Sequence, residues 1–307
     1  MSGSRRLVAV LVAFALLPAG VSEAGWLSDL FKGRDSKQDS AHKPATALKP
    51  HLAGKPPVEK PAFAKPAPSL AAKCEPAKLR IAVDVGHTKQ SDGAMSARDV
   101  PEYSFNLNLA QRVVEKLKSE GFAETRLLIT EGKARPSLIR RVASANGMKA
   151  DLFLSIHHDS VPDKFKENWE FEGRKLEYSD RFSGYSLFVS KENPHFQTSL
   201  HLAQLIGREL KAKNLRYADQ YALPIMGRYR HDLLDKDVGI YRYDHLVVLM
   251  RTQMPAVLLE AGSIINRDEE VQMASSERQD MITRAVATAF RKFCGPSPAT
   301  VASGKPN

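Results

Sequence analysis

Histidine and glutamate side chains stand at the ends of short apolar runs in this 307-residue sequence. His87 follows the first such run, His157 ends a later one, and Glu260 ends the last. Two imidazoles and a carboxylate form a donor set for catalytic zinc, which commonly takes three protein ligands and leaves a fourth position for water. A lone histidine after a strand is more often structural, but the presence of such groups at three strand ends favours a metal site. The sequence has no HExxH motif, so a thermolysin-type zinc site is excluded.

These apolar runs are predicted to be buried strands that alternate with amphipathic helices. Strands are expected at 79–85, 126–130, 151–156, 185–189, 245–250 and 256–259, and helices at 101–121, 136–148, 194–213 and 268–293. The segment 160–183 is predicted to be a surface excursion, and 214–243 to be mostly loop. This alternation is typical of an α/β fold, here a largely parallel twisted sheet with helices on both faces in a single catalytic domain. Because ligands of open α/β sheets bind beyond the carboxyl ends of the strands, His87, His157 and Glu260 are expected to meet there.

The N-terminal segment has the order of charged, apolar and small residues that is typical of a secretory signal. Arg5 and Arg6 precede an apolar run at 7–17, and small residues follow up to Ala24. We therefore predict a signal peptide at 1–24, cleaved after Ala24, and a periplasmic or secreted protein. The alternative is a transmembrane anchor, but the uninterrupted apolar run is about half of the ~20 residues that a span needs. No other segment is apolar enough, so no transmembrane segment is expected after signal cleavage.

Proline, alanine and lysine dominate the segment 25–78, which is predicted to be a disordered tether. Eight of the 18 prolines lie within 32–78, where ten basic against four acidic residues supply six of the chain's ten net positive charges. These basic residues do not belong to a folded surface, which together with export argues against a nucleic-acid partner. The tether charge either attracts anionic envelope polymers weakly or only aids solubility. The catalytic domain is expected at 79–295, and 296–307 is expected to be a disordered tail.

The only two cysteines, Cys74 and Cys294, stand at opposite borders of the expected domain. Disulfides persist in exported proteins, and these two residues can pair only with each other within one chain. The termini of a compact domain often lie close together, so a disulfide is predicted. Two unpaired thiols are the alternative that the sequence leaves open.

Several motifs in this chain resemble the zinc-dependent N-acetylmuramoyl-L-alanine amidases of the amidase type 3 family. They are Val83–His87, Pro101–Tyr103 with Asn106–Ala110, Arg141–Asn146, Ala150–His157, Pro255–Glu260 and Asn266, in the family's order across about 80–290. The resemblance implies that His87, Glu102 and His157 hold zinc and that Glu260 is the catalytic residue. Without the resemblance, Glu102 reads as an acidic residue that the helix dipole favours in a first helical turn.

Two residues beside the implied zinc ligands have open roles. Asp84 either holds an imidazole in one tautomer or hydrogen-bonds the turn after its strand. His158 either orients a ligand or substrate or is simply exposed. The sequence departs from the family pattern at Val85, Thr88–Gln90, Glu131 and His158–Asp159. None of these departures removes an implied ligand, so they bear on substrate preference more than on catalysis.

The activity implied by the resemblance is zinc-dependent hydrolysis of the amide between N-acetylmuramic acid and L-alanine in peptidoglycan. Cell-wall remodelling or daughter-cell separation is the implied setting. Zinc would activate water and polarise the carbonyl, while Glu260 would take the water's proton and return it to the leaving nitrogen. A zinc peptidase that cuts the stem peptide would keep the same metal site. A non-catalytic cell-wall binding module is disfavoured, because binding alone does not need Glu260.

Related amidases can carry a self-blocking helix after the third strand. In this sequence the corresponding excursion at 160–183 is short and contains Gly173, Ser179 and Asp180. We therefore expect no long occluding helix there, and dependence on an activator protein is not indicated.

Overall fold

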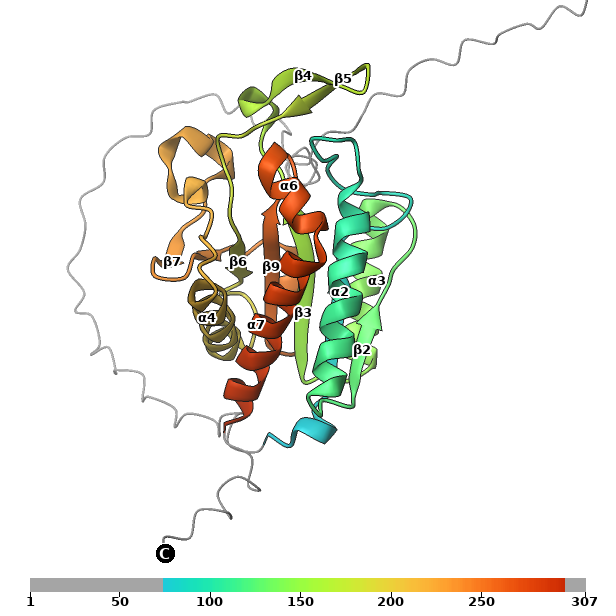
Figure 1. Ribbon diagram of the computed structural model, residues 1–307. Coiled ribbons are helices and arrows are strands. Elements are labelled where there is room, and N and C mark those ends of the chain that lie inside the picture. The colour runs from blue at the N-terminus through green and yellow to red at the C-terminus, as the bar shows by residue number, and fades with distance from the viewer. Residues whose placement is uncertain (1–73, 296–307) are drawn as a thin grey trace, which may run out of the picture.

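A seven-stranded sheet forms the centre of the computed structural model, which describes residues 74–295 (Figure 1). Its strands are, in spatial order, β2 (Thr125–Leu128), β1 (Ile81–Val85), β3 (Leu152–Asp159), β9 (Ala256–Ser263), β6 (Ser186–Val189), β8 (Ile240–Arg242) and β7 (Leu233–Asp235). Four neighbouring pairs are parallel, whereas β6–β9 and β7–β8 are antiparallel. The largely parallel α/β sheet predicted from the sequence is confirmed.

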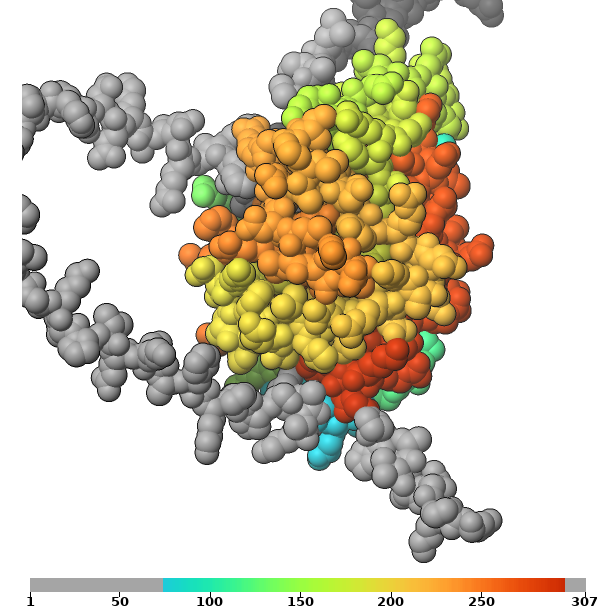
Figure 2. All heavy atoms as spheres, turned by 90° about the vertical axis from the view of Figure 1, so that its left-hand side faces the viewer, coloured from blue at the N-terminus to red at the C-terminus, as the bar shows by residue number. Residues whose placement is uncertain are grey.

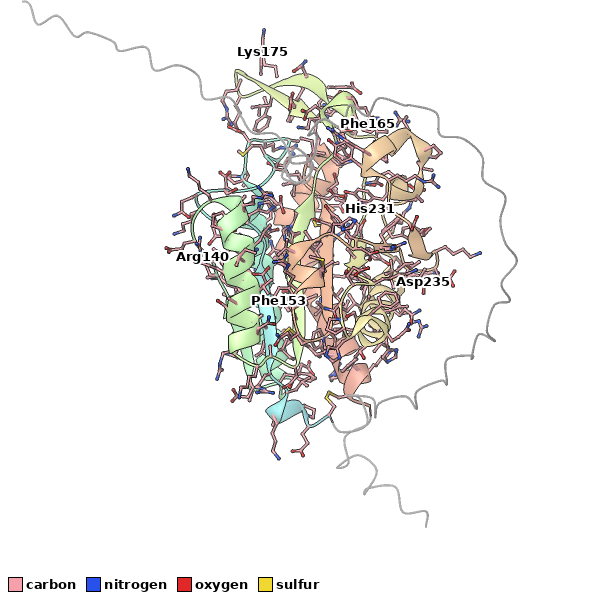
Figure 3. The ribbon with its side chains drawn as sticks, turned by 180° about the vertical axis from the view of Figure 1, so that it is seen from behind. Arg140, Phe153, Phe165, Lys175, His231 and Asp235 are labelled. Carbon is pink, nitrogen blue, oxygen red and sulfur yellow. A yellow bond between two sulfur atoms is a disulfide. The ribbon has the colours of Figure 1, made fainter. Side chains whose placement is uncertain are left out.

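Helices cover both faces of this sheet, as the sequence predicts. They are α2 (Glu102–Ser119), α3 (Ala134–Gly147), α4 (Phe196–Ala212), α5 (Val247–Met250), α6 (Arg267–Ala274) and α7 (Ser276–Cys294). Val83 and Leu154 belong to the core beneath α2, α4 and α7, whereas their chain neighbours Ala82 and Phe153 belong to the core beneath α3 and α5. Figure 3 shows the second face, with Phe153 labelled. Because strands of this kind are buried on both sides, they read as uninterrupted apolar runs.

Helix α2 explains why Glu102 lies at the edge of the sheet. Pro101 is extended, with φ −63° and ψ 140°, and its fixed φ suits a helix start. Apolar side chains recur every four residues on the buried face of α2: Phe105, Leu109, Val113 and Leu117. Gly121 has φ 94°, the left-handed conformation that favours glycine just past a helix end. Glu102 therefore lies in the first turn of a helix whose apolar stripe fixes it against the sheet.

The strand predicted at 245–250 is wrong, because this segment contains the short helix α5. Val248 and Leu249 of α5 are buried in the core that α3 also contributes to. The side-chain amide of Asn193 donates to the carbonyl of Leu249 (2.7 Å), which holds the helical turn in place. A short apolar run has the same pattern whether it forms a buried strand or a buried helical turn, so the sequence cannot separate the two.

The single helix predicted at 268–293 is two helices, α6 and α7. Ser275 between them is extended, with φ −76° and ψ 142°, and its hydroxyl accepts a hydrogen bond from the backbone N–H of Arg278. Asn266 caps α6 in the same way, accepting from the N–H groups of Asp268 and Glu269. Serine and asparagine are preferred at this position, because their side chains satisfy N–H groups that the helix leaves unpaired.

The predicted surface excursion at 160–183 and the segment 214–243, predicted to be mostly loop, both contain regular structure. Residues 160–183 include an antiparallel hairpin of β4 (Glu167–Phe171) and β5 (Arg174–Tyr178). Its turn residues Glu172 and Gly173 have φ 51° and 72°, as in the turns that join hairpin strands most tightly. The segment 214–243 contributes η4 (Gln220–Ala222), η5 (Pro224–Tyr229), β7 and β8. Figure 2 shows this segment, in orange, covering the face of the molecule between the hairpin and α4.

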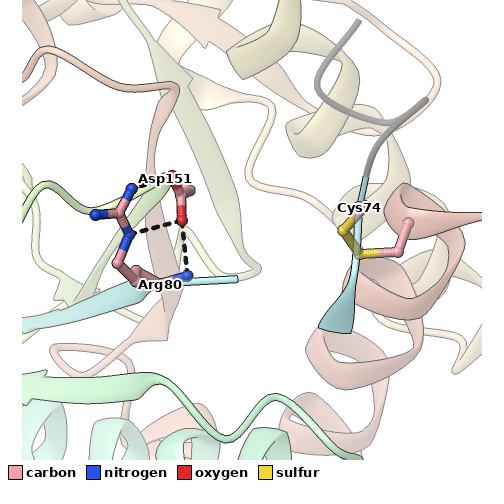
Figure 4. The surroundings of a disulfide bond; sticks show 4 residues. Cys74, Arg80 and Asp151 are labelled. Carbon is pink, nitrogen blue, oxygen red and sulfur yellow. Dashed lines mark hydrogen bonds and ion pairs between the residues drawn. A yellow bond between two sulfur atoms is a disulfide. The ribbon is translucent and has the colours of Figure 1, made fainter. Parts of the chain in front are cut away.

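Cys74 and Cys294 form a disulfide, with their Cα atoms 5.0 Å apart (Figure 4). The predicted pairing is confirmed. The bridge joins the residues before β1 to the end of α7. Close to it, the guanidinium of Arg80 donates two hydrogen bonds to Asp151 (3.0 and 2.8 Å), which ties the start of β1 to the start of β3.

Replacing both cysteines by serine is expected to lower the free energy of unfolding by up to about 5 kcal/mol, because the bridge closes a loop with a sequence separation of 220 residues. Urea unfolding of the parent and of the double variant measures the difference. Thiol titration of the unreduced, denatured protein should find no free thiol. Two free thiols, or an unchanged urea midpoint in the double variant, would contradict the prediction.

The predicted signal peptide at 1–24, most of the predicted tether at 25–78 and the predicted tail at 296–307 lie outside the described residues. The last five tether residues are described, and Pro76–Lys78 form a short 3-10 helix, η2. Within residues 74–295, no helix has the length and apolar character needed to cross a membrane.

Candidate metal centre

Neighbouring strands place the predicted site residues at one edge of the sheet. β1, β3 and β9 are adjacent and parallel, with His157 directly beside Glu260 in the register. The N–H of Gly86 donates to the carbonyl of Ile156 (2.9 Å), so β1 stays paired with β3 up to the residue before His87. The three strands therefore bring His87, His157 and Glu260 to the same edge of the sheet, with β3 and β9 continuing a few residues beyond His157 and Glu260.

The carboxylate of Glu102 lies between the two histidines. Its Oε2 is 3.0 Å from Nε2 of His87, and its Oε1 is 3.0 Å from Nδ1 of His157. One ligand atom from each of the three residues lies within 4.8 Å of the others. Ligand atoms of a tetrahedral zinc ion with bonds of about 2.1 Å are roughly 3.4 Å apart, so this donor set fits zinc.

The three side chains are buried, and the surroundings of Glu102 and His157 favour the protonation states that bind a metal. His87 is 7% exposed, Glu102 1% and His157 3%. Burial alone raises the pKa of Glu102, but the electrostatic interaction with His87 and the hydrogen bond with His157 outweigh burial and hold that pKa well below its ordinary value. Burial lowers the pKa of His157, against the influence of Glu102. An ionised carboxylate and a neutral imidazole are the forms that coordinate a cation.

Asn106 fixes the orientation of the Glu102 carboxylate. Its Nδ2 donates to Oε1 of Glu102 (3.0 Å) and to the carbonyl of Gly86 (3.2 Å). Its Oδ1 lies 2.8 Å from Nδ1 of His158. His158 is 2% exposed, so the alternative that it is exposed is wrong, and burial lowers its pKa to about 3. The sequence does not single out Asn106 as a site residue, although its position four residues after Glu102 puts both on one side of α2.

A buried ion pair supports the turn that carries His87. Nη1 of Arg141 donates to Oδ2 of Asp84 (3.1 Å), and Nη2 of Arg141 donates to the carbonyl of His87. The hydroxyl of Ser155 donates to the same Asp84 oxygen (2.7 Å). His87 has φ 65°, which non-glycine residues seldom adopt, and the contact with Arg141 holds this conformation. Asp84 does not bond the turn directly in any of these contacts, but it supports the turn through Arg141.

Glu260 is buried beside the three converging side chains. It is 3% exposed, and its Oε2 has no hydrogen-bond partner among residues 74–295. Burial, followed by the neighbouring carboxylates of Asp159 and Glu102, raises the pKa of Glu260 well above its ordinary value. An unpaired buried carboxylate oxygen is unfavourable in a folded protein, so its presence points to a functional group.

Tyr221 adds a further buried polar contact in the neighbourhood of Glu260. Its hydroxyl donates to Oδ2 of Asp159, whose Oδ1 accepts from the N–H of Ser160. Burial raises the pKa of Asp159 to about 7. Tyr221 belongs to the segment that the sequence predicts to be mostly loop, and no motif there indicates that it reaches the sheet.

The family profile described as N-acetylmuramoyl-L-alanine amidase matches residues 81–292. The chain belongs to this amidase family. It is 24% identical over 224 residues to a putative N-acetylmuramoyl-L-alanine amidase of Buchnera aphidicola, covering 69% of this chain and 95% of that protein. It is also 24% identical over 255 residues to the N-acetylmuramoyl-L-alanine amidase AmiC of Escherichia coli, covering 76% of this chain and 56% of that protein.

Solved amidase structures share the fold of this family member. The N-acetylmuramyl-L-alanine amidase Ami1 of Mycobacterium smegmatis aligns with TM-score 0.54 and 20% identity, covering 72% of this chain and 99% of that one. The catalytic domain of CwlV, an amidase of Bacillus (Paenibacillus) polymyxa var. colistinus, aligns with TM-score 0.51 and 23% identity, covering 70% and 97%. The resemblance stated from the sequence motifs is therefore confirmed, as is the single catalytic domain of α/β class.

The segment that follows β3 in this amidase does not carry a long helix. Between β3 and β6 the described residues contain the three-residue η3 (Asp163–Phe165) and the hairpin β4–β5. The excursion at 160–183 is thus a β structure at the place where related amidases can carry a self-blocking helix.

Proposed function

We propose that this chain is a zinc-dependent hydrolase that cleaves the amide between the lactyl group of N-acetylmuramic acid and L-alanine in peptidoglycan. His87, Glu102 and His157 hold the zinc ion, and Glu260 is the acid–base residue. The supporting observation is the convergence of three donor side chains within 4.8 Å beside the unpaired Oε2 of Glu260, in a chain that matches the amidase family over residues 81–292. When bound, zinc supplies the Lewis acidity that activates water and polarises the scissile carbonyl.

Glu260 moves the proton in this reaction. Its carboxylate accepts a proton from the attacking water as the new C–O bond forms, and delivers it to the L-alanine nitrogen as the C–N bond breaks. The products are a free lactyl carboxylate and a free α-amino group. Asn106 orients the Glu102 carboxylate, and Arg141 holds the turn of His87, so both residues keep the ligand set in place.

Product analysis of digested, purified peptidoglycan tests the activity. We expect mass spectrometry to find peptides with a free L-alanine amino group and glycan with a free lactyl carboxylate. A chelator should abolish product formation, and added zinc should restore it. New amino groups on other stem residues would identify a zinc peptidase instead, and binding without release would identify a binding module.

Export belongs to the same proposal. A signal peptide at 1–24 would carry the domain at 79–295 to the periplasm or outside the cell, where peptidoglycan lies. The tether at 25–78 would contact anionic envelope polymers weakly through its basic residues. Cell-wall remodelling or daughter-cell separation is the setting that this activity suits.

A further inference from the structure

The hairpin β4–β5 is separate from the seven-stranded sheet. It lies beyond the edge of the sheet where α2 begins, with Lys175 at its outer end (Figures 1 and 3). A two-stranded hairpin is at best marginally stable by itself. Its position therefore depends on the contacts that its side chains make with the rest of the domain.

Two arginines hold the aromatic side chains of the hairpin. The guanidinium carbon of Arg98 lies 5.5 Å from the ring centre of Trp169 and 5.4 Å from that of Phe171. The guanidinium carbon of Arg267 lies 3.8 Å from the ring centre of Tyr178 and 5.2 Å from that of Trp169. These distances are within the range of cation–π attraction, and Trp169 is the ring that both arginines contact.

The two arginines are themselves fixed around α6. Nη1 of Arg98 lies 2.6 Å from a carboxylate oxygen of the buried Glu270 and donates to the carbonyl of Arg267 (2.8 Å). Nε of Arg267 donates to Oδ2 of Asp180 (2.9 Å), just after β5. The hairpin, α6 and the loop that carries Arg98 are therefore one connected unit.

Trp169 also hydrogen-bonds the loop that leads to Glu102. Its indole Nε1 donates to the carbonyl of Ala97 (3.0 Å). The N–H of the same buried Ala97 donates to the carbonyl of Ile264, just beyond β9 (2.9 Å). Both backbone polar groups of Ala97 are thus satisfied, one by the continuation of β9 and the other by the hairpin.

This loop contacts the Glu102 carboxylate directly. The N–H of Ala94 donates to Oε2 of Glu102 (3.2 Å), and the N–H of Glu102 donates to the carbonyl of Ala94 (2.8 Å). Ala94 precedes Ala97 by three residues in the chain. The position of the carboxylate therefore depends on a loop whose own position the hairpin helps to fix.

We propose that Trp169 is a positioning residue for the metal centre. Its hydrogen bond to Ala97, together with its packing between Arg98 and Arg267, holds the loop 94–101 against Glu102. The inference rests on the proposed function, because it takes Glu102 as a zinc ligand. Removing a group that orients a metal ligand typically weakens metal binding by about 10- to 100-fold.

Zinc affinity of the full chain, measured by competition with a chromophoric chelator well below the melting temperature of the metal-free protein, tests the inference. Trp169→Ala removes the hydrogen bond and the packing, and its Kd for zinc is expected to rise about tenfold or more. Trp169→Phe keeps a smaller aromatic ring between the arginines and loses the hydrogen bond, so a rise of about threefold is expected. Lys175→Ala, at the exposed end of the same hairpin, is the matched control and should stay within about twofold of the parent.

The visible absorption of the cobalt-substituted protein is a second readout that does not require activity. Trp169→Ala should alter the absorption bands, because the carboxylate ligand moves, and Lys175→Ala should not. A zinc Kd of Trp169→Ala that stays within about twofold of the parent value would overturn the inference, because a rise of about tenfold or more is expected. If Trp169→Ala does not fold, Trp169→Phe decides the question. Weaker zinc binding by Trp169→Phe would support the inference, and unchanged zinc binding would contradict it. An incorrect assignment of the zinc site itself would give a different result, because the parent and His157→Ala would then bind zinc equally weakly.

Discussion

Glutamine in place of Glu260 is expected to lower the rate of peptidoglycan hydrolysis by about 10²-fold or more while zinc stays bound. The substitution keeps the size and shape of the side chain and removes only its capacity to accept a proton. Glu260 lies beside His157 on the neighbouring strand but outside the three-residue donor group. Zinc affinity should therefore change little. The turnover rate on purified peptidoglycan and the zinc content of the purified protein are the two measurements.

His157→Ala provides the contrast for this experiment. It removes one of the three donors, so zinc and activity should be lost together. Hydrolysis by Glu260→Gln within about fivefold of the parent rate would contradict a proton-transfer role, because a positioned acid–base group contributes about 10²-fold or more. Loss of zinc from Glu260→Gln would instead place Glu260 among the ligands.

The central strands could be predicted because burial leaves a plain pattern in the sequence. β1, β3 and β9 are covered by helices on both faces and buried at every position, so each contains a run of apolar residues that stands out from its surroundings. Helix α2 is equally plain, because its apolar residues recur every four positions and glycine follows its end. In these elements the local pattern and the tertiary environment agree.

Most of the elements that the sequence analysis assigned wrongly or did not assign depend on neighbours far along the chain. The apolar run at 245–250 could form a strand or a helical turn, and packing against the core beside α3 selects the turn. The hairpin β4–β5 is rich in charge, and its aromatic residues are held by Arg98 and Arg267 rather than by the main core. Ser275 starts a new helix within an apparently continuous one, a capping signal that periodicity alone overlooks.

The candidate site also contains residues that the sequence could place and residues that it could not. His87, His157 and Glu260 could be placed together because the carboxyl ends of adjacent parallel strands share one edge. Glu102 needed the family resemblance, since an acidic residue in a first helical turn has a simpler explanation. Nothing in the sequence indicated that Tyr221 lies near the site, because its partner Asp159 is 62 positions away in the chain and the contact exists only after folding. Polar partners joined only by tertiary structure leave no periodic trace in the sequence.

Alanine in place of Gly86 is expected to lower zinc affinity and activity by about 100-fold or more, through a single added methyl group. A Cβ at this position would lie 2.4–2.6 Å from three ring atoms of His157. Real side chains do not approach this closely, so the imidazole must leave its present position, in which Nδ1 lies 3.0 Å from Oε1 of Glu102. Displacements of about 1 Å in a catalytic group reduce rates by about 10²-fold. Zinc titration and turnover on purified peptidoglycan measure the two effects.

Gly147→Ala is the matched control for this substitution. Nothing lies within 4 Å of a Cβ built at Gly147, the last residue of α3. Alanine is a better helix former than glycine by up to about 1 kcal/mol, so this variant should keep zinc and be as stable as the parent or slightly more so. Gly86 does not have a positive φ, so alanine there meets the imidazole without straining the backbone, and the metal-free variant should still fold. Zinc binding by Gly86→Ala within about threefold of the parent would contradict the expected 100-fold loss and show that His157 is not held where a ligand must be.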